Sequence, residues 1–191
     1  MLQMLRTCQP GAVPDGAWVA IQVQSNAERN VDLGLKQRGY ESFLPLYKIR
    51  RQRSHGSVTL ELPLFRGYLF CRWAAFNPDR IVAIPRVVRI IGNGRTPIPV
   101  DECEITALQT ISRAGVAAKP WPFLRVGQHI QVVAGPLRGA EGSILRLKDE
   151  WRLVVSVNLL QRSVAAEIDR NCIAPANSSD ATSSWPRNGA G

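Results

Sequence analysis

The sequence predicts an α+β domain followed by a small all-β domain, and three observations support this division. Up to Gly115, extended segments alternate with segments whose apolar residues recur at helical spacing. After Phe123, short segments rich in β-branched residues are separated by turn residues, and the helical period is gone. Pro120 and Pro122 stand between the two patterns, so residues 116–122 are expected to form a semi-rigid linker.

The first domain is expected over residues 17–115 and begins with a strand. Trp18–Gln24 alternates apolar and polar residues as a strand does. Ser25 and Glu28 have the S-x-x-E spacing of a capping box, which predicts a helix directly after this strand. Gly39 is expected to end that helix.

An antiparallel meander and two further helices complete the expected first domain. Residues 41–53, 57–64 and 68–73 are extended segments, the first two joined by a hairpin. Asn77-Pro78 and Asp101 are suitable helix starts, and the second of these helices is expected to run to about residue 115. Helices packed on an antiparallel sheet define an α+β fold.

The second domain is expected over residues 123–176 and is read as a small β-barrel. Its expected strands are residues 129–133, 143–147, 151–157 and 163–168. Gly135, Gly139 and Gly142 permit positive φ or close backbone approach, and Pro136 pre-sets its own backbone angle. These residues predict a tight turn, which is either an ordinary hairpin loop or a recognition loop.

Residues at the two ends of the chain are expected to lie outside the folded domains. Residues 1–16 lack periodicity and are read as a flexible lead-in. Residues 177–191 are dominated by Ser, Asn, Ala and Gly, a composition typical of a disordered tail.

Composition restricts the classes of function. The chain has 191 residues, 45% of them hydrophobic, and a formal net charge of +9, which favours a nucleic-acid or ribonucleoprotein partner. Its four cysteines form no C-x-x-C pair, so neither a metal site nor a redox pair is expected. No apolar run reaches the length of a membrane span and no signal-peptide core is present, so a cytoplasmic protein is expected. We also expect a monomer.

The sequence argues against catalysis. His55 and His129 have no nearby Cys or Ser in a recognisable nucleophile motif. Nucleotide-binding glycine motifs and acid pairs with metal spacing are missing as well. We therefore expect a binding protein that is not an enzyme and has no cofactor.

Three segments carry a resemblance to a known family. Residues 126–142 (VGQHIQVVAGPLRGAEG) resemble the KOW motif of the NusG and RfaH family of transcription elongation factors. Residues 63–70 (PLFRGYLF) resemble the signature strand of that family's N-terminal domain, called NGN, and residues 18–23 resemble its opening strand. The resemblance covers roughly residues 17–176 and implies an NGN domain followed by an SH3-like KOW barrel.

The resemblance implies a polymerase-binding site on the first domain. Phe65 and Tyr68 match aromatic residues that, in the family, line a hydrophobic depression for the clamp helices of the RNA polymerase largest subunit. The alternative is that Leu64, Leu69 and one of these aromatics are core residues of the strand. Arg66 stands where the family usually has proline.

A basic hairpin is the candidate nucleic-acid site. Lys48, Arg50, Arg51 and Arg53 form the densest basic cluster, and such side chains contact phosphates. The alternative is a solvated hairpin tip. Arg29 is a further candidate, because family members that touch the non-template DNA strand of the transcription bubble use polar residues of this helix.

The second domain carries a candidate partner surface. The resemblance implies that Leu159, Leu160 and Arg162 engage Rho or a small-subunit ribosomal protein. The alternative is that the two leucines are core residues at a barrel corner. Gln161 replaces a glycine that is common in the family at this point.

Together these features predict a transcription elongation and antitermination factor. The first domain is expected to bind the polymerase clamp and suppress pausing or termination, while the KOW domain recruits a second factor. Segments such as Phe43-Leu44-Pro45-Leu46-Tyr47 are similar to those of the specialised UpxY-like paralogues of the family. The alternative is a KOW-type RNA-binding or ribosome-associated protein without a polymerase role.

Overall fold

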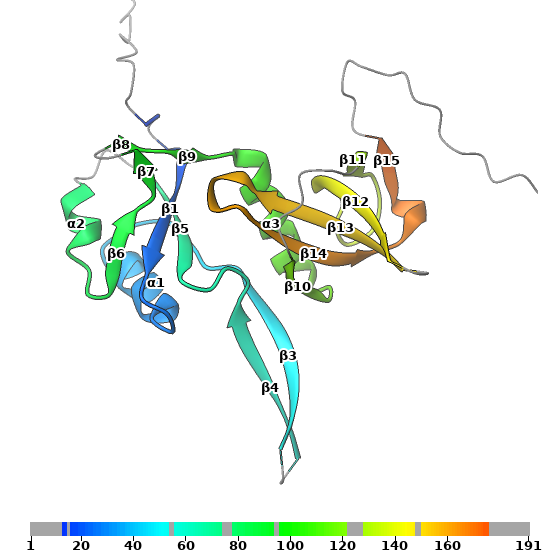
Figure 1. The fold of residues 1–191 in the computed structure, drawn as a ribbon, viewed down its shortest axis with the longest axis horizontal. Helices are drawn as coiled ribbons and strands as arrows, with labels where there is room; N and C mark the ends of the chain where they lie inside the picture. The colour runs from blue at the N-terminus through cyan, green and yellow to red at the C-terminus, as the bar shows by residue number, and fades with distance from the viewer. Residues whose placement is uncertain are drawn as a thin grey trace, which may run out of the picture.

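The structure is a computed structural model, and it describes residues 13–14, 16–53, 56–73, 78–93, 96–121, 128–147 and 150–175. His55, most of the expected lead-in and the whole of the expected tail 177–191 lie outside these ranges. Figure 1 shows two bodies, with a long hairpin projecting from the first. Across the described ranges, no helix is both long and apolar enough to cross a membrane.

An antiparallel sheet forms the centre of the first domain, as the sequence predicts. Its strand order is β2-β5-β1-β6, and β9 also pairs with β1. The strands are β1 (Trp18–Val23), β2 (Ser42–Phe43), β5 (Tyr68–Arg72), β6 (Val87–Ile90) and β9 (Pro99–Val100). Two short strands, β7 (Gly92–Asn93) and β8 (Thr96–Pro97), form a separate pair nearby.

Helices cover both faces of this sheet because successive side chains of a strand point to opposite faces. Val19 and Ile21 belong to one buried cluster together with α1 (Glu28–Gln37) and residues next to α2 (Pro78–Val82). Trp18 and Ala20 face the other way, onto α3 (Glu102–Ala114). The expected α+β arrangement is confirmed.

The start of α1 differs from the expected capping box. Its N-terminal flanking residue is Ala27, and no side chain caps the helix. Glu28 is only 3% exposed, and its Oε1 accepts a hydrogen bond from the Gly67 backbone N at 2.8 Å. Because Glu28 is the first helical residue and not the third, its carboxylate reaches the turn before β5 and not the backbone of Ser25.

The start and end of α3 agree with the sequence. The Asp101 carboxylate accepts from the Cys103 backbone N at 3.1 Å, as an N-cap residue does. Gly115 follows the last turn in the left-handed conformation, with φ of +64°. The end of the expected lead-in also belongs to the fold, since Val13 packs on the first core and the Gly16 N donates to the Trp73 carbonyl at 2.5 Å.

Strands β3 (Leu46–Arg53) and β4 (Gly56–Pro63) pair only with each other among the described strands. They form the long hairpin that projects away from both domains in Figure 1.

The second domain is an antiparallel six-stranded sheet in the order β10-β14-β13-β12-β11-β15. Its members are β10 (Ala118–Trp121), β11 (Gln128–Val132), β12 (Glu141–Leu147), β13 (Glu150–Val157), β14 (Arg162–Ile168) and β15 (Ile173–Pro175), with 3₁₀ turns η1 (Asn158–Leu160) and η2 (Arg170–Cys172). The expected β-rich domain is therefore confirmed.

The glycine turn between β11 and β12 has the predicted chemistry. Gly135 and Gly139 have φ of +77° and +87°. A Cβ on Gly142 would lie 2.6 Å from the Val154 carbonyl oxygen, so only glycine fits beside β13.

The structure corrects the expected linker. Within residues 116–122, Ala118–Trp121 form β10 and pair with β14. Pro120 has no N–H to donate, but β10 is the outermost strand, where proline is tolerated. Of the two prolines that predict a linker, Pro120 thus lies in an edge strand of the second domain, and Pro122 lies outside the described residues.

The two domains share one core. Helix α3 lies between the first sheet and the second domain in Figure 1, and it contacts β12 and β13. One continuous cluster joins Phe70 and Leu108 of the first domain to Leu153 and Val164 of the second. The second domain is consequently docked on the first.

Candidate functional site

Phe65, the first predicted polymerase anchor, is buried at the junction of the domains. It lies in the turn between β4 and β5, is 1% exposed, and makes an edge-to-face contact with Phe70 at 5.8 Å between ring centroids. Leu64 and Leu69 are buried too, at 3% and 0% exposure. Phe65 belongs to the cluster that both domains share, so in this arrangement it offers no free surface.

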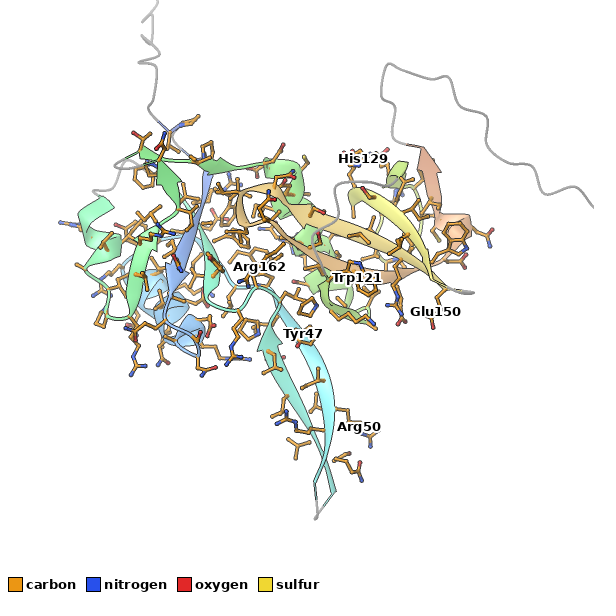
Figure 2. All side chains as sticks on the ribbon, in the orientation of Figure 1. Tyr47, Arg50, Trp121, His129, Glu150 and Arg162 are labelled. Carbon is orange, nitrogen blue, oxygen red and sulfur yellow. The ribbon has the colours of Figure 1, made fainter. Side chains whose placement is uncertain are left out.

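Tyr68, the second predicted anchor, faces the second domain. The Arg162 Cζ atom lies 4.9 Å from the centroid of the Tyr68 ring, a cation–π contact. The Arg162 Nη1 also donates to the Arg66 carbonyl oxygen at 3.1 Å. Arg162 lies where the loop after β13 meets the first domain (Figure 2). One residue of each predicted partner surface therefore contacts the other surface.

Leu159 and Leu160 lie in the turn η1 that carries Arg162 onto the first domain. Both are half-buried and pack against the shared core. Gln161 takes the left-handed conformation with φ of 51°, and its Nε2 donates to the Asn158 carbonyl oxygen at 2.7 Å. The turn thus keeps a backbone conformation that favours glycine although this chain has glutamine there.

A second polar contact joins the domains at the other end of η1. The Glu104 Oε1 accepts from the Asn158 backbone N at 3.2 Å and from its Nδ2 at 2.7 Å. Desolvation raises the pKa of the Glu104 carboxyl, and the two hydrogen bonds from Asn158 offset part of this shift. No sequence motif signals this pair, because its members stand far apart in the chain and belong to different domains.

The crevice beside this contact combines acidic residues, a cysteine and a histidine. It is lined by residues that include Asp101, Cys103, Glu104, His129 and Glu141. Desolvation and a hydrogen bond to Asp101 raise the pKa of the Cys103 thiol to about 11, so it is protonated at neutral pH and a poor nucleophile. Within the described ranges, no group of three or more His, Cys, Asp or Glu residues could hold a metal ion.

The hairpin divides the predicted basic cluster between two faces. Lys48 lies opposite Glu61 and Arg50 opposite Thr59, so both cations point to one face. Arg51 lies opposite Val58 and points to the other face. The side chain of Arg53 lies outside the described part of the chain.

Helix α1 brings Arg29 to the hairpin. The Arg29 Nη2 lies 3.0 Å from the Glu61 Oε2, and both side chains are largely exposed. Glu61 is the cross-strand neighbour of Lys48. Arg29, Lys48 and Arg50 therefore form one surface, from which Arg51 is separated. In Figure 2 Arg50 lies far out on the hairpin, away from Arg162.

Comparisons with known proteins agree with the predicted family. Residues 16–109 match the family model described as transcription termination factor nusG. The chain is 28% identical over 170 residues to the transcription termination/antitermination protein NusG of Helicobacter pylori (strain ATCC 700392 / 26695), a match that covers 79% of this chain and 93% of that protein. The protein of the same name from Vibrio vulnificus (strain CMCP6) is 25% identical over 170 residues, with 82% and 93% covered.

A solved structure has the same fold. The structure described as "Domain interaction in Thermotoga maritima NusG" matches with a TM-score of 0.52 and 16% identity, over 84% of this chain and 97% of that chain. The structural match shows that the two chains share a fold, and the sequence matches are all to proteins named as transcription termination or antitermination factors. The chain is thus similar to proteins of the NusG family, whose model matches its first domain.

Proposed function

We propose that this protein is a transcription elongation and antitermination factor that binds the RNA polymerase clamp through its first domain and recruits a second factor through its KOW domain. Its curated relatives carry the name transcription termination/antitermination protein. Phe65 and Tyr68 are the proposed polymerase anchors; Leu159, Leu160 and Arg162 are the proposed partner surface. In the proposal, clamp binding favours the active conformation of the polymerase over the paused one.

One observation carries the proposal: the two surfaces assigned to different partners cover each other. Aromatic rings and arginines dominate the energetics of protein interfaces, and Tyr68 with Arg162 is such a pair. Apolar surface of this kind is unfavourable in water, and here each domain hides that of the other. Surfaces suited to partners are thus kept from solvent within the chain.

The docked arrangement places a condition on binding. Phe65 is 1% exposed, so a clamp helix reaches it only after the domains separate. The apparent dissociation constant is then the intrinsic constant divided by the fraction of open molecules. Polymerase and the KOW partner both select the open form, so each is expected to strengthen the binding of the other.

The nucleic-acid part of the proposal concerns the hairpin. Arg29, Lys48 and Arg50 share one exposed surface suited to the phosphates of the non-template strand. The sequence predicts Arg51 and Arg53 as phosphate contacts as well, but Arg51 points to the opposite face and is left out of the proposed phosphate-binding surface. We also propose a specialised UpxY-like role, with Rho or a small-subunit ribosomal protein as the KOW partner.

The experiment uses the two members of one contact. Full-length wild type, Tyr68→Ala and Arg162→Ala are titrated against purified core polymerase from the source organism. Tyr68→Ala removes an anchor and should cost about 1 to 3 kcal/mol of binding. Arg162→Ala only loosens the docked arrangement and should strengthen polymerase binding.

The opposite signs are the decisive result. If both variants bind like wild type, the assigned site is wrong. If wild type recovers ribosomes or RNA from cells and no polymerase, the alternative of a ribosome-associated KOW protein replaces the proposal.

A further inference from the structure

The hairpin of β3 and β4 has an apolar face that continues outward from the shared core. Register and strand alternation place five apolar residues on one face. We define this apolar face as Tyr47, Ile49, Val58, Leu60 and Leu62.

Coverage of this face falls from base to tip. Tyr47 packs against the shared core, and β10 lies against β3 near the base. Further out, Ile49 and Leu60 are partly buried, and Val58 is 42% exposed. A two-stranded ribbon is only marginally stable by itself in water, so an uncovered aliphatic face on one is unusual without a partner.

The opposite face of the same hairpin is polar beyond the pair of Leu46 and Pro63 at its base. Its cross-strand pairs beyond the base are Lys48 with Glu61, Arg50 with Thr59 and Gln52 with Ser57. The two faces therefore differ in chemistry although they belong to the same pair of strands.

Arg51 supplies a charge at the outer end of the apolar face. It lies across from Val58 and is exposed. Among the salt bridges formed by the described residues, none involves Arg51. A partner that covers Val58 thus meets an unneutralised guanidinium beside the aliphatic surface, and a carboxylate is its natural complement.

We propose that the apolar face docks a protein segment of RNA polymerase that presents aliphatic side chains with a carboxylate beside them; this inference rests on the proposed function. Protein is favoured over nucleic acid because bases bind by stacking on aromatic rings, and the outer part of this face is aliphatic. Charge complementarity to Arg51 selects an acidic segment over a basic one.

This contact differs from the clamp contact in its accessibility. Tyr68 is covered by Arg162 in the docked arrangement, whereas Val58 is already exposed. The apolar face is therefore available to polymerase before the domains separate.

The test compares neighbouring residues on opposite faces of the full-length protein. Arg51→Gln and Gln52→Glu each change the charge by the same amount, one on each face. Val58→Ser and Thr59→Ser form a second pair. Each variant is titrated against purified core polymerase without nucleic acid, and circular dichroism confirms that it is folded.

We expect Arg51→Gln and Val58→Ser each to weaken binding about fivefold, as rim contacts of an interface do. Gln52→Glu and Thr59→Ser should bind within about twofold of wild type, because they lie on the polar face.

Several results would overturn the inference. Equal losses for both members of each pair would mean that the face does not matter. Changed affinity for a single-stranded DNA oligonucleotide with unchanged polymerase affinity would make nucleic acid the occupant. A wild-type dimer that dissociates in Val58→Ser, seen by sedimentation, would make it a second copy. If wild type itself does not bind polymerase, the proposed function is wrong. If wild type binds and all the hairpin variants bind equally well, only the inference about the hairpin is wrong, and the proposed function stands.

Discussion

The turn before β5 and the hairpin that leads into it both present apolar side chains, yet they lie in different surroundings. Phe65 is 1% exposed beneath the second domain, and Val58, seven positions earlier, is 42% exposed on the hairpin. The difference arises from what lies opposite each of them. Helix α3 and the second domain close over the turn, while the hairpin projects beyond both domains.

This contrast separates two kinds of binding surface in one domain. The surface at the turn is hidden by the chain itself, and its polar rim is satisfied by Arg162 and Asn158. The surface on the hairpin has no such cover on its outer half. A partner therefore competes with the second domain at the first surface and with water alone at the second.

The largest expected effect is the loss of stability when the buried Phe65 is truncated. Phe65→Ala should lower the free energy of unfolding by about 3 to 5 kcal/mol, because it leaves a cavity in the shared core. Ile49→Ala on the half-exposed hairpin face should cost about 1 kcal/mol. Urea denaturation of both variants measures the difference; a cost below about 1 kcal/mol for Phe65→Ala would show that the residue is not packed as described.

The next effect concerns the contact that covers Tyr68. A double-mutant cycle of Tyr68→Ala and Arg162→Ala should give a coupling free energy of about 0.5 to 2 kcal/mol in urea unfolding. Lys119→Ala is the matched control, since its cation–π contact with Trp121 lies within the second domain. Small-angle scattering should show domain separation in Arg162→Ala and none in Lys119→Ala; separation in both would contradict an interdomain role specific to Arg162.

The third prediction sharpens the division of the hairpin. Replacing Lys48 and Arg50 together by glutamine should reduce the salt slope of binding to a transcription bubble by up to about two, one for each phosphate that the variant no longer neutralises. Arg51→Gln should leave the slope unchanged, because Arg51 points to the apolar face. Fluorescence anisotropy between low and moderate salt provides the slopes. If the salt slope changes equally for each residue replaced on either face, the position of a charge on one face or the other does not matter for binding.

The smallest expected effect is a pH dependence from Glu104. Because desolvation raises its pKa in the folded protein above the ordinary value of 4.5, the folded state binds this proton more tightly than the unfolded state. The contribution to stability is therefore fully present below 4.5 and is lost as pH rises through the folded-state pKa. Chemical denaturation of wild type and Glu104→Gln should show this trend in wild type only. Parallel pH profiles for the two proteins would exclude it.

Asp101 contributes in the opposite direction and in another pH range. Hydrogen bonds from Cys103 lower the pKa of the Asp101 carboxyl below its ordinary value of 3.8. Its stabilising effect is therefore present above 3.8 and is lost as pH falls through the lower folded-state pKa. Comparing wild type with Glu104→Gln above pH 4.5 therefore separates the effect of Glu104 from that of Asp101, whose pKa lies below 3.8.

Local sequence signals were enough for several elements of each domain. Asp101 at a helix start, Gly115 at its end and the glycines before β12 act through backbone geometry within a few residues, so the pattern shows them. Of the segment that resembles the signature strand, residues 68–70 form the start of β5, and residues 64–67 form the turn before it.

Contacts between distant segments explain what the sequence could not show. Glu28 has the spacing of a capping residue, but a backbone N in the turn before β5 takes its carboxylate. Pro120 predicts a linker because the sequence pattern does not show that its segment pairs with β14. The sequence allows both a surface and a core position for Phe65, since its burial depends on a second domain docking over it.

The pairing of β10 with β14 also sets the reach of the second domain. Between the last residue of α3 and the first of β10 only residues 115–117 intervene, and three residues span at most about 10 Å. An α-helix with its side chains is about 10 to 12 Å across, so a partner helix cannot enter by straight withdrawal of one domain from the other. The second domain has to swing about Gly115 or release β10, which would lengthen the tether to at least residues 115–121, about 24 Å when extended. The short tether also keeps the released domain at high effective concentration near its docking site, so it recaptures that site quickly once a partner leaves.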